Sequence, residues 1–210
     1  MNSTKKRNAI YMKSKLIDFI IDSYKDEDII IGSEVMYGSR KGLVDIIQLC
    51  NKKLFAFEIK ADNDDFRKLP VQINEYKYIF DYIYIVVTNK YLTKAEALPY
   101  KGLGIIIINE DGHCKVLKKA TLQHGNNKVE ILSTINAQFL KSHFKLNNKL
   151  KSSEVRGLLC NKGIGLIKET LYNYFFHNIS PRYKLFLSEK ENPTHIDDVA
   201  ILSLYGRKII

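Results

Sequence analysis

Two neighbouring apolar segments with a polar corner constrain most strongly how this chain can fold. Residues 43–49 and 54–60 are rich in β-branched and aromatic side chains, and residues 50–53 between them favour a turn. We therefore expect an antiparallel β-hairpin. Because side chains alternate along a strand, Glu58 and Lys60 share one face, and Phe57 and Ile59 are expected on the opposite, buried face.

The polar residues of this hairpin need a physical explanation. A carboxylate and an ammonium group in an apolar central strand are costly unless they are paired or bind a metal. Asp45 lies on the adjacent predicted strand and can reach the same corner as Glu58 and Lys60. A purely structural Glu–Lys ion pair at a strand end is the alternative explanation.

These three residues suit phosphodiester hydrolysis. Mg²⁺ prefers oxygen ligands in octahedral geometry, which Asp45, Glu58 and the backbone carbonyl of Ile59 could supply together with waters. Such a cation activates a water and neutralises the phosphate, and Lys60 would orient that water or stabilise the developing oxyanion. The pattern thus predicts a phosphodiesterase that depends on Mg²⁺ or Mn²⁺.

A predicted helix follows the hairpin and carries two more polar residues. Pro70 suits a first helical position, so we expect a helix over residues 70–81. Gln72 and Tyr76 are four residues apart and share one face of it. Either their polar tips contact the activated water or a substrate phosphate, or Tyr76 is a half-buried core residue and Gln72 is solvated.

The residues described so far resemble the PD-(D/E)XK, or restriction-endonuclease-like, nuclease superfamily. Asp45 matches its first acid, with Val-Asp in place of Pro-Asp, and Glu58 and Lys60 match its E-x-K motif. Gln72 and Tyr76 match the Q-x-x-x-Y signature of the RecB-type branch, in which a glycine like Gly42 precedes the acid.

The resemblance extends over about residues 10–110 and is close to an uncharacterised bacterial nuclease-like family of that superfamily. It implies catalytic roles for Asp45, Glu58, Lys60, Gln72 and Tyr76, and one or two divalent cations bound at Asp45 and Glu58. It also implies action mostly on DNA, although some members have lost activity.

Two further residues have alternative roles. Many relatives place a third acid upstream of the aspartate, so Glu34, in a predicted edge strand over residues 32–37, either ligates a metal or faces solvent. Arg67 precedes the predicted helix and either holds a phosphate or pairs with Asp64 or Asp65.

The order of the remaining elements indicates an α/β fold. We expect an amphipathic helix over residues 10–24, a short helix over 94–98, and strands over 82–88, 104–109 and 114–118. The strands over 82–88 and 104–109 are continuously apolar, as when helices cover both faces of a sheet. We predict an α/β/α sandwich with a mixed central sheet, which the resemblance implies to be restriction-endonuclease-like.

The chain divides near a polar stretch at residues 123–127, into a nuclease-like core (1–122) and a C-terminal helical region (123–210). Expected helices in the second part cover residues 129–144, a segment near Glu154 capped by Ser152 or Ser153, 166–177 and 197–204. They either pack on the sheet or form a clamp for nucleic acid or a docking surface for a protein partner.

The charge favours a polyanionic partner. The net charge is +10 and the isoelectric point is about 9.3, which concentrates phosphate ligands near the chain. Basic residues cluster at Lys5–Arg7 and in a connector with Lys145, Lys149 and Lys151, for which we expect contacts to nucleic acid. DNA is favoured over RNA because of the resemblance.

Other classes of protein are disfavoured. No run of about 18 apolar residues exists and the N-terminus lacks a signal-peptide core, so we expect no membrane association and a cytoplasmic location. Cys50, Cys114 and Cys160 are odd in number and far apart, which favours reduced thiols over a zinc site.

The sequence thus predicts a metal-dependent nuclease. The alternative is a catalytically silent module on a nuclease fold that binds nucleic acid or protein within a phage or defence complex. Substrate structure, endo or exo action and the oligomeric state, including a homo-oligomer, stay open at this point.

Overall fold

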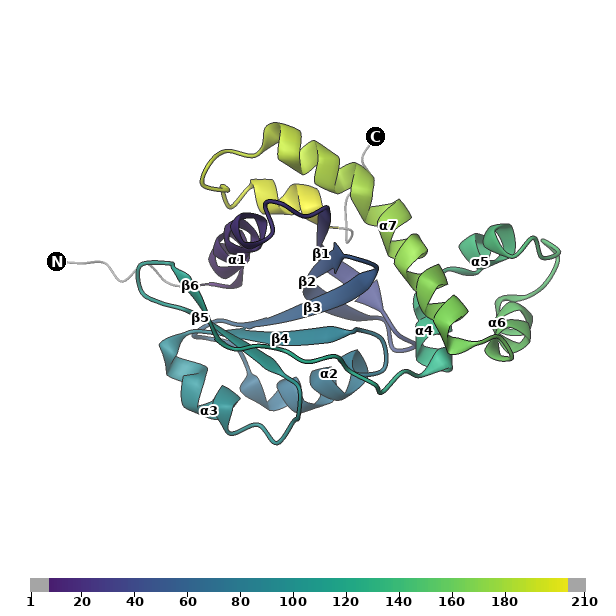
Figure 1. Ribbon diagram of the computed structural model, residues 1–210, viewed down its shortest axis with the longest axis horizontal. Coiled ribbons are helices and arrows are strands. Elements are labelled where there is room, and N and C mark those ends of the chain that lie inside the picture. Colours follow the sequence, from purple (N-terminus) through teal and green to yellow (C-terminus); the bar gives the residue numbers. More distant parts are fainter. Residues whose placement is uncertain (1–7, 204–210) are drawn as a thin grey trace.

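A six-stranded mixed β-sheet forms the centre of the computed structural model, which describes residues 8–203 (Figure 1). The strands lie in the sheet in chain order: β1 (Ile29–Tyr37), β2 (Gly42–Cys50), β3 (Lys53–Lys60), β4 (Tyr82–Val87), β5 (Gly104–Ile108) and β6 (Cys114–Lys118). β3, β4 and β5 are parallel neighbours, and the other neighbouring pairs are antiparallel. The predicted α/β class and the mixed sheet are confirmed.

The central hairpin has the predicted strands and faces. β2 and β3 are joined by a tight turn in which Asn51 and Lys52 both have positive φ, as type I′ hairpin turns require. Phe57 and Ile59 are buried on one side of the sheet, and Ala56 is buried on the other side. The alternation of the sequence therefore predicted correctly which face each side chain occupies.

Helices cover both faces of the sheet and enclose a core on each side. The first core lies under α2 (Leu69–Tyr76), α3 (Leu92–Glu96) and α4 (Lys128–Thr134). The second core lies under α1 (Ala9–Ser23) and the 3₁₀ helix η3 (Asp198–Leu202). Figure 1 shows α1 and η3 above the sheet and α2 and α3 below it.

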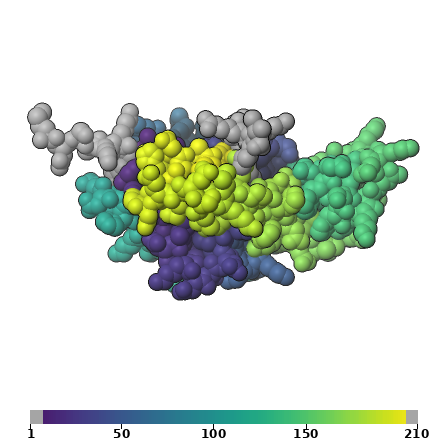
Figure 2. All heavy atoms as spheres, turned by 90° about the horizontal axis from the view of Figure 1, so that it is seen from above, coloured from purple at the N-terminus to yellow at the C-terminus, as the bar shows by residue number. Residues whose placement is uncertain are grey.

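The longest helix joins the two cores. α7 (Ile164–Glu189) contributes Leu171 and Ile179 to the first core, and Tyr183 and Phe186 to the second. The space-filling view shows it running across the molecule towards a separate end (Figure 2). That end is formed by α5 (Ala137–His143) and α6 (Ser152–Cys160), which project beyond the sheet (Figures 1 and 2).

The prediction of one helix over residues 129–144 is wrong. Ile135 has an extended backbone, and the Asn136 side chain accepts a hydrogen bond from the Phe139 N–H at 2.7 Å, so α4 ends and α5 begins here. Asparagine favours such a cap over a place inside a helix, because its side chain satisfies a free N–H of the first turn. Arg156 of α6 donates to the carbonyls of Leu132 and Ile135 at the C-terminal end of α4.

Other predicted helices also differ from the structure. The cap expected at Ser152 or Ser153 is wrong, because α6 begins at Ser152 and Lys151 is its N-cap. α7 continues well past residue 177 and through Pro181, because Ile179, Tyr183 and Phe186 are buried and their packing outweighs the tendency of a proline to break a helix. α2 ends at Tyr76 rather than near residue 81, because Asp81 is already bonded to Leu54 of the sheet. The predicted helix over 197–204 is the 3₁₀ helix η3, and Leu204, like Lys5–Arg7, lies outside the described residues.

Within residues 8–203, no helix is both long enough and apolar enough to cross a lipid bilayer.

A buried ion pair fixes α7 to the sheet. Lys168 contacts one carboxylate oxygen of Asp81, and the other oxygen accepts a hydrogen bond from the Leu54 N–H at 2.9 Å. Asp81 is 2% exposed, so neither its charge nor the Leu54 N–H has water as a substitute partner.

We expect Asp81→Ala to lower the free energy of unfolding by about 3–5 kcal/mol, because it leaves a partly buried lysine and a buried N–H without their acceptor. Asp65→Ala, which removes the partner of the exposed Arg67, should lower the free energy of unfolding much less, because solvent screens that pair. Urea unfolding of both variants measures the difference. Equal losses would show that the ion pair does not fix α7.

Candidate active site

The site begins where β2 and β3 separate. Their last paired residues at this end are Ile46 and Phe57, and the next pair in the same register would be Asp45 and Glu58. Instead, Asp45 Oδ2 accepts a hydrogen bond from the Ile59 N–H at 2.9 Å. Asp45 therefore contacts the residue between Glu58 and Lys60, so the structure brings the three predicted residues to one corner of the sheet.

Glu58 and Lys60 form a buried pair at this corner. Lys60 Nζ lies 2.8 Å from Glu58 Oε1 and 3.0 Å from Gln72 Oε1 of α2. Glu58 is 2% and Lys60 is 6% exposed. Gln72 therefore faces the site, as one of the two expectations has it, and its direct contact is with the lysine.

Tyr76 holds the same carboxylate from the opposite direction. Its hydroxyl donates a short hydrogen bond to Glu58 Oε2, and its side chain is fully buried. Burial raises the pKa of Tyr76 well above its usual value, so the hydroxyl stays protonated and remains a donor. A direct contact of Tyr76 with a substrate phosphate is not available in this structure; Tyr76 orients Glu58 instead.

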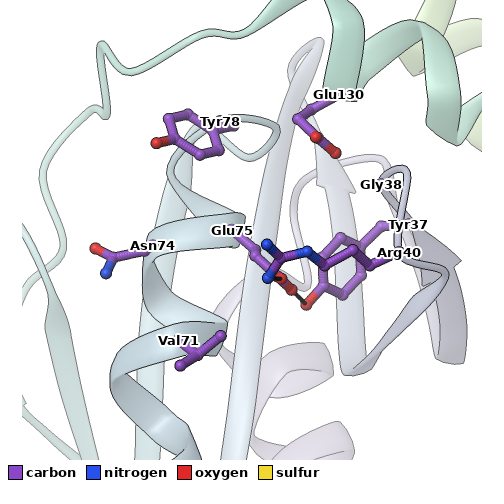
Figure 3. A pocket seen from close by; sticks show the side chains of 8 residues that line it. All are labelled: Tyr37, Gly38, Arg40, Val71, Asn74, Glu75, Tyr78 and Glu130. Carbon is purple, nitrogen blue, oxygen red and sulfur yellow. Dashed lines mark hydrogen bonds and ion pairs between the residues drawn. The ribbon is translucent and has the colours of Figure 1, made fainter.

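A second layer of residues supports Tyr76. Its ring packs against that of Tyr37 with the centroids 5.1 Å apart, and the Tyr37 hydroxyl donates to Glu75 Oε2 at 3.1 Å. Glu75 also pairs with Arg40 at 3.0 Å. Tyr37, Arg40 and Glu75 line a cavity of about 280 Å³ between α2 and the tip of the β1–β2 hairpin (Figure 3). Glu58 is not among the residues that line this cavity; it is linked to it through Tyr76, whose ring packs on Tyr37.

Sequence reasoning missed one residue of the site, Lys13 of α1. Its ammonium lies 3.0 Å from Glu34 Oε1 and 3.6 Å from Asp45 Oδ1, with 7% of the side chain exposed. A signal was present in the sequence: Lys13 precedes Leu16 by three residues and Ile17 by four, which places a lysine on the buried face of the helix.

Glu34 sits at an irregular point of β1. Its φ of 50° is rare for a residue with a side chain, and it interrupts the pairing with β2 opposite Asp45. Both of its oxygens are engaged, by Lys13 and by the Ser203 hydroxyl at 2.9 Å. Burial raises the pKa of Glu34, but Lys13 and Ser203 outweigh it, so the pKa lies below the usual value.

The ionised forms of the other two carboxylates, Glu58 and Asp45, are electrostatically disfavoured. Burial raises the pKa of Glu58, the charge of Asp45 raises it further, and Lys60 and Tyr76 offset only part of the effect. Burial likewise raises the pKa of Asp45 against the opposing effects of Lys13, the Ile59 N–H and Lys60. When all groups are ionised, three carboxylates face two ammonium groups, and one negative charge is left over.

The donor set suits a hard divalent cation. Within residues 8–203, no three His, Cys, Asp or Glu side chains lie together so as to hold a metal by themselves. Mg²⁺, however, commonly uses one or two carboxylates and keeps several waters. Asp45 and Glu58 supply two carboxylates. The N–H of Ile59 donates to Asp45, and the carbonyl of Ile59 points to the same side of the strand as this N–H, so it is directed towards Asp45 as well.

The remaining predicted residues lie elsewhere. Arg67 pairs with Asp65 through two hydrogen bonds, and its side chain is 91% exposed, which matches the ion-pair alternative. Lys145, Lys149 and Lys151 are exposed on the connector between α5 and α6, at the projecting end of the molecule. Lys141, by contrast, is bonded to the Asn148 carbonyl.

Comparisons with known proteins give one family. The family model described as Bacteriophage P4 protein cII matches residues 1–203. No curated protein matches the chain. Among solved structures, a protein of unknown function from Silicibacter pomeroyi is 17% identical, with 69% of this chain and 90% of that chain covered and a TM-score of 0.45.

The raised pKa of Glu58 has a consequence for stability. Folded Glu58 holds its proton more tightly than the unfolded chain does, so the free energy of unfolding falls as pH rises from about 4.3 through the folded pKa. We expect Glu58→Gln to weaken this fall, so that in EDTA the variant gains stability relative to the wild type as the pH rises above about 4.3. Asp45 also has a raised pKa, so its contribution to the decrease in the free energy of unfolding remains in this variant.

Unfolding by urea at several pH values measures this difference. Glu110→Gln, at an exposed position after β5, is the matched control and should follow the wild type within about 0.5 kcal/mol. Parallel curves for wild type and Glu58→Gln would contradict the inferred charge imbalance.

Proposed function

This chain belongs to the bacteriophage P4 protein cII family, and we propose that it is a metal-dependent nuclease that hydrolyses phosphodiester bonds, in DNA rather than RNA. One observation carries the proposal: Asp45, Glu58 and Lys60 meet in a buried corner whose negative charge is not fully offset by the chain's own cations. The proposal includes a restriction-endonuclease-like arrangement of the fold. The mixed sheet with helices on both faces is compatible with it.

The cation would be Mg²⁺ or Mn²⁺, held by Asp45, Glu58 and the Ile59 carbonyl. When bound, it supplies charge neutralisation for the phosphate and eases deprotonation of the attacking water. Asp45 is suited to this role because its side chain is 28% exposed and so is accessible from solvent. Glu58 is fixed by Lys60 and Tyr76, which keeps its carboxylate in one orientation.

Lys60 has one N–H hydrogen-bond donor available for the reaction. An ammonium group has three N–H donors, and among the described residues Glu58 and Gln72 accept from two of them. The third is free to hold the attacking water or a phosphate oxygen on which charge develops. Gln72 and Tyr76 act as positioning residues, since each contacts Lys60 or Glu58 directly.

The competing proposal is a catalytically silent module on the same fold. Lys13 favours it, because a second buried ammonium beside Asp45 is what a metal-free corner would need. The raised pKa values of Asp45 and Glu58 favour the nuclease, because the two lysines do not offset the burial of these carboxylates.

A cleavage assay separates the two. We expect the purified chain to cleave at least one of linear, circular, branched or single-stranded DNA with Mg²⁺ or Mn²⁺ and not with EDTA. Asp45→Ala and Glu58→Ala should each abolish cleavage, since each removes a cation ligand. Lys60→Ala should lower kcat more than metal affinity, because a protonated amine cannot be a ligand.

Asp111→Ala is the matched control, because Asp111 is an exposed acid in the turn before β6. Asp45→Asn, which keeps an acceptor for the Ile59 N–H, separates loss of the ligand from local misfolding. Undiminished cleavage by Asp45→Ala would place the activity elsewhere. Binding of DNA by the wild type without cleavage under any of these conditions would favour the silent module.

The projecting end offers a test of nucleic-acid binding. We expect replacement of Lys145, Lys149 and Lys151 by Gln to weaken DNA binding and to reduce the slope of log affinity against log salt by up to about 0.9 per lost contact on duplex DNA. Fluorescence anisotropy across a salt series measures both quantities.

The matched control replaces three exposed lysines at the edge of the sheet, Lys115, Lys118 and Lys119, and so removes the same charge. If both triple variants lose affinity equally, net charge and not this connector attracts the DNA. If neither changes, α5 and α6 serve packing or a protein partner.

A further inference from the structure

Lys13 is a buried cation for which the proposed reaction has no use. It is 6% exposed, and its ammonium bridges two carboxylates from neighbouring strands, Glu34 of β1 and Asp45 of β2. Burying a lysine is costly, so it is expected only where its charge is needed. Here the charge is needed because the carboxylates of Glu34 and Asp45 lie close together.

The carboxylate of Glu34 is held in place by contacts to both of its oxygens. One oxygen of Glu34 accepts from Lys13 at 3.0 Å and the other from the Ser203 hydroxyl at 2.9 Å. The positive φ of Glu34 places it opposite Asp45, where two carboxylates would otherwise repel each other. Lys13 therefore occupies the position between two carboxylates that would, without it, suit a divalent cation.

We propose that Lys13 takes the place of a second metal ion, so that the site binds a single divalent cation at Asp45 and Glu58 and Glu34 is not a ligand. This inference rests on the proposed nuclease site. In two-metal sites the cations lie about 3.5–4 Å apart and share a carboxylate. Asp45 is the carboxylate in the sharing position here, and its Oδ1 lies 3.6 Å from the ammonium of Lys13.

The charge of the cluster supports one cation. Glu34, Asp45 and Glu58 face Lys13 and Lys60, which leaves one excess negative charge. One divalent cation turns this into one excess positive charge, which a phosphate group complements. A second would add two more positive charges beside two nearly buried ammonium groups, at a large Coulomb cost.

Mn²⁺ titration tests the inference without an assay of activity. With EDTA-treated protein, calorimetry or the electron paramagnetic resonance of free Mn²⁺ should give a single ion per wild-type chain. Lys13→Gln should bind a second ion between Glu34 and Asp45, and its first ion about tenfold more tightly, because a repelling charge is gone. The double variant Lys13→Gln/Glu34→Gln should return to a single ion, because the second pair of carboxylates no longer exists.

Two further variants serve as controls. Lys15→Gln removes the same charge from the same helix, where Lys15 lies over the Tyr11 ring, and should keep a single ion. Glu34→Gln should also keep a single ion, because Lys13 retains Asp45. This variant and the wild type decide the question even if Lys13→Gln does not fold, which a thermal melt of each variant shows.

The outcomes separate this inference from the proposed function. Two ions in the wild type together with cleavage would overturn the role of Lys13 and leave the nuclease intact. A single ion without cleavage of any DNA would overturn the nuclease and leave the role of Lys13. An unchanged count and affinity in Lys13→Gln, or loss of the ion in Glu34→Gln, would overturn the inference, and no Mn²⁺ binding at all would overturn both proposals.

Discussion

The hydrogen bond from the Ile59 N–H to Asp45 is the interaction on which the site depends. Backbone pairing of β2 and β3 ends at Ile46 and Phe57, and the strands can separate because a side chain takes over as acceptor for the next N–H. This separation admits Asp45 beside Glu58. Lys13 then contacts Asp45, and Lys60 and Tyr76 contact Glu58, so that the charge of each carboxylate is partly offset and its position is held.

Much of this arrangement could be predicted from local pattern. The alternation along β3 set Glu58 and Lys60 on one face, and the spacing of Gln72 and Tyr76 set both on the side of α2 that faces the sheet. The alternation of side chains along a strand and the i, i+4 spacing along a helix involve only residues close in sequence, so they can be read from the sequence directly. The same holds for β4 and β5, whose continuous apolar runs matched strands buried on both faces.

Features that depend on distant partners could not be predicted in this way. Lys13 faces carboxylates 21 and 32 positions further along the chain, and no local rule couples a helix to that hairpin. α7 passes Pro181 because buried contacts in two cores outweigh a local break signal. The end of α4 is different, because the cap at Asn136 was a local signal that the apolar pattern around it obscured.

The position of α7 in both cores has a consequence for synthesis of the chain. The six strands are complete at Lys118, whereas the helix that covers part of each face ends only at Glu189. At usual elongation speeds, the ribosome needs roughly 4 to 14 s to add the intervening residues. During that interval the nascent sheet exposes apolar surface that α7 will later cover, so this chain is most prone to aggregate when more than half of it has already been made.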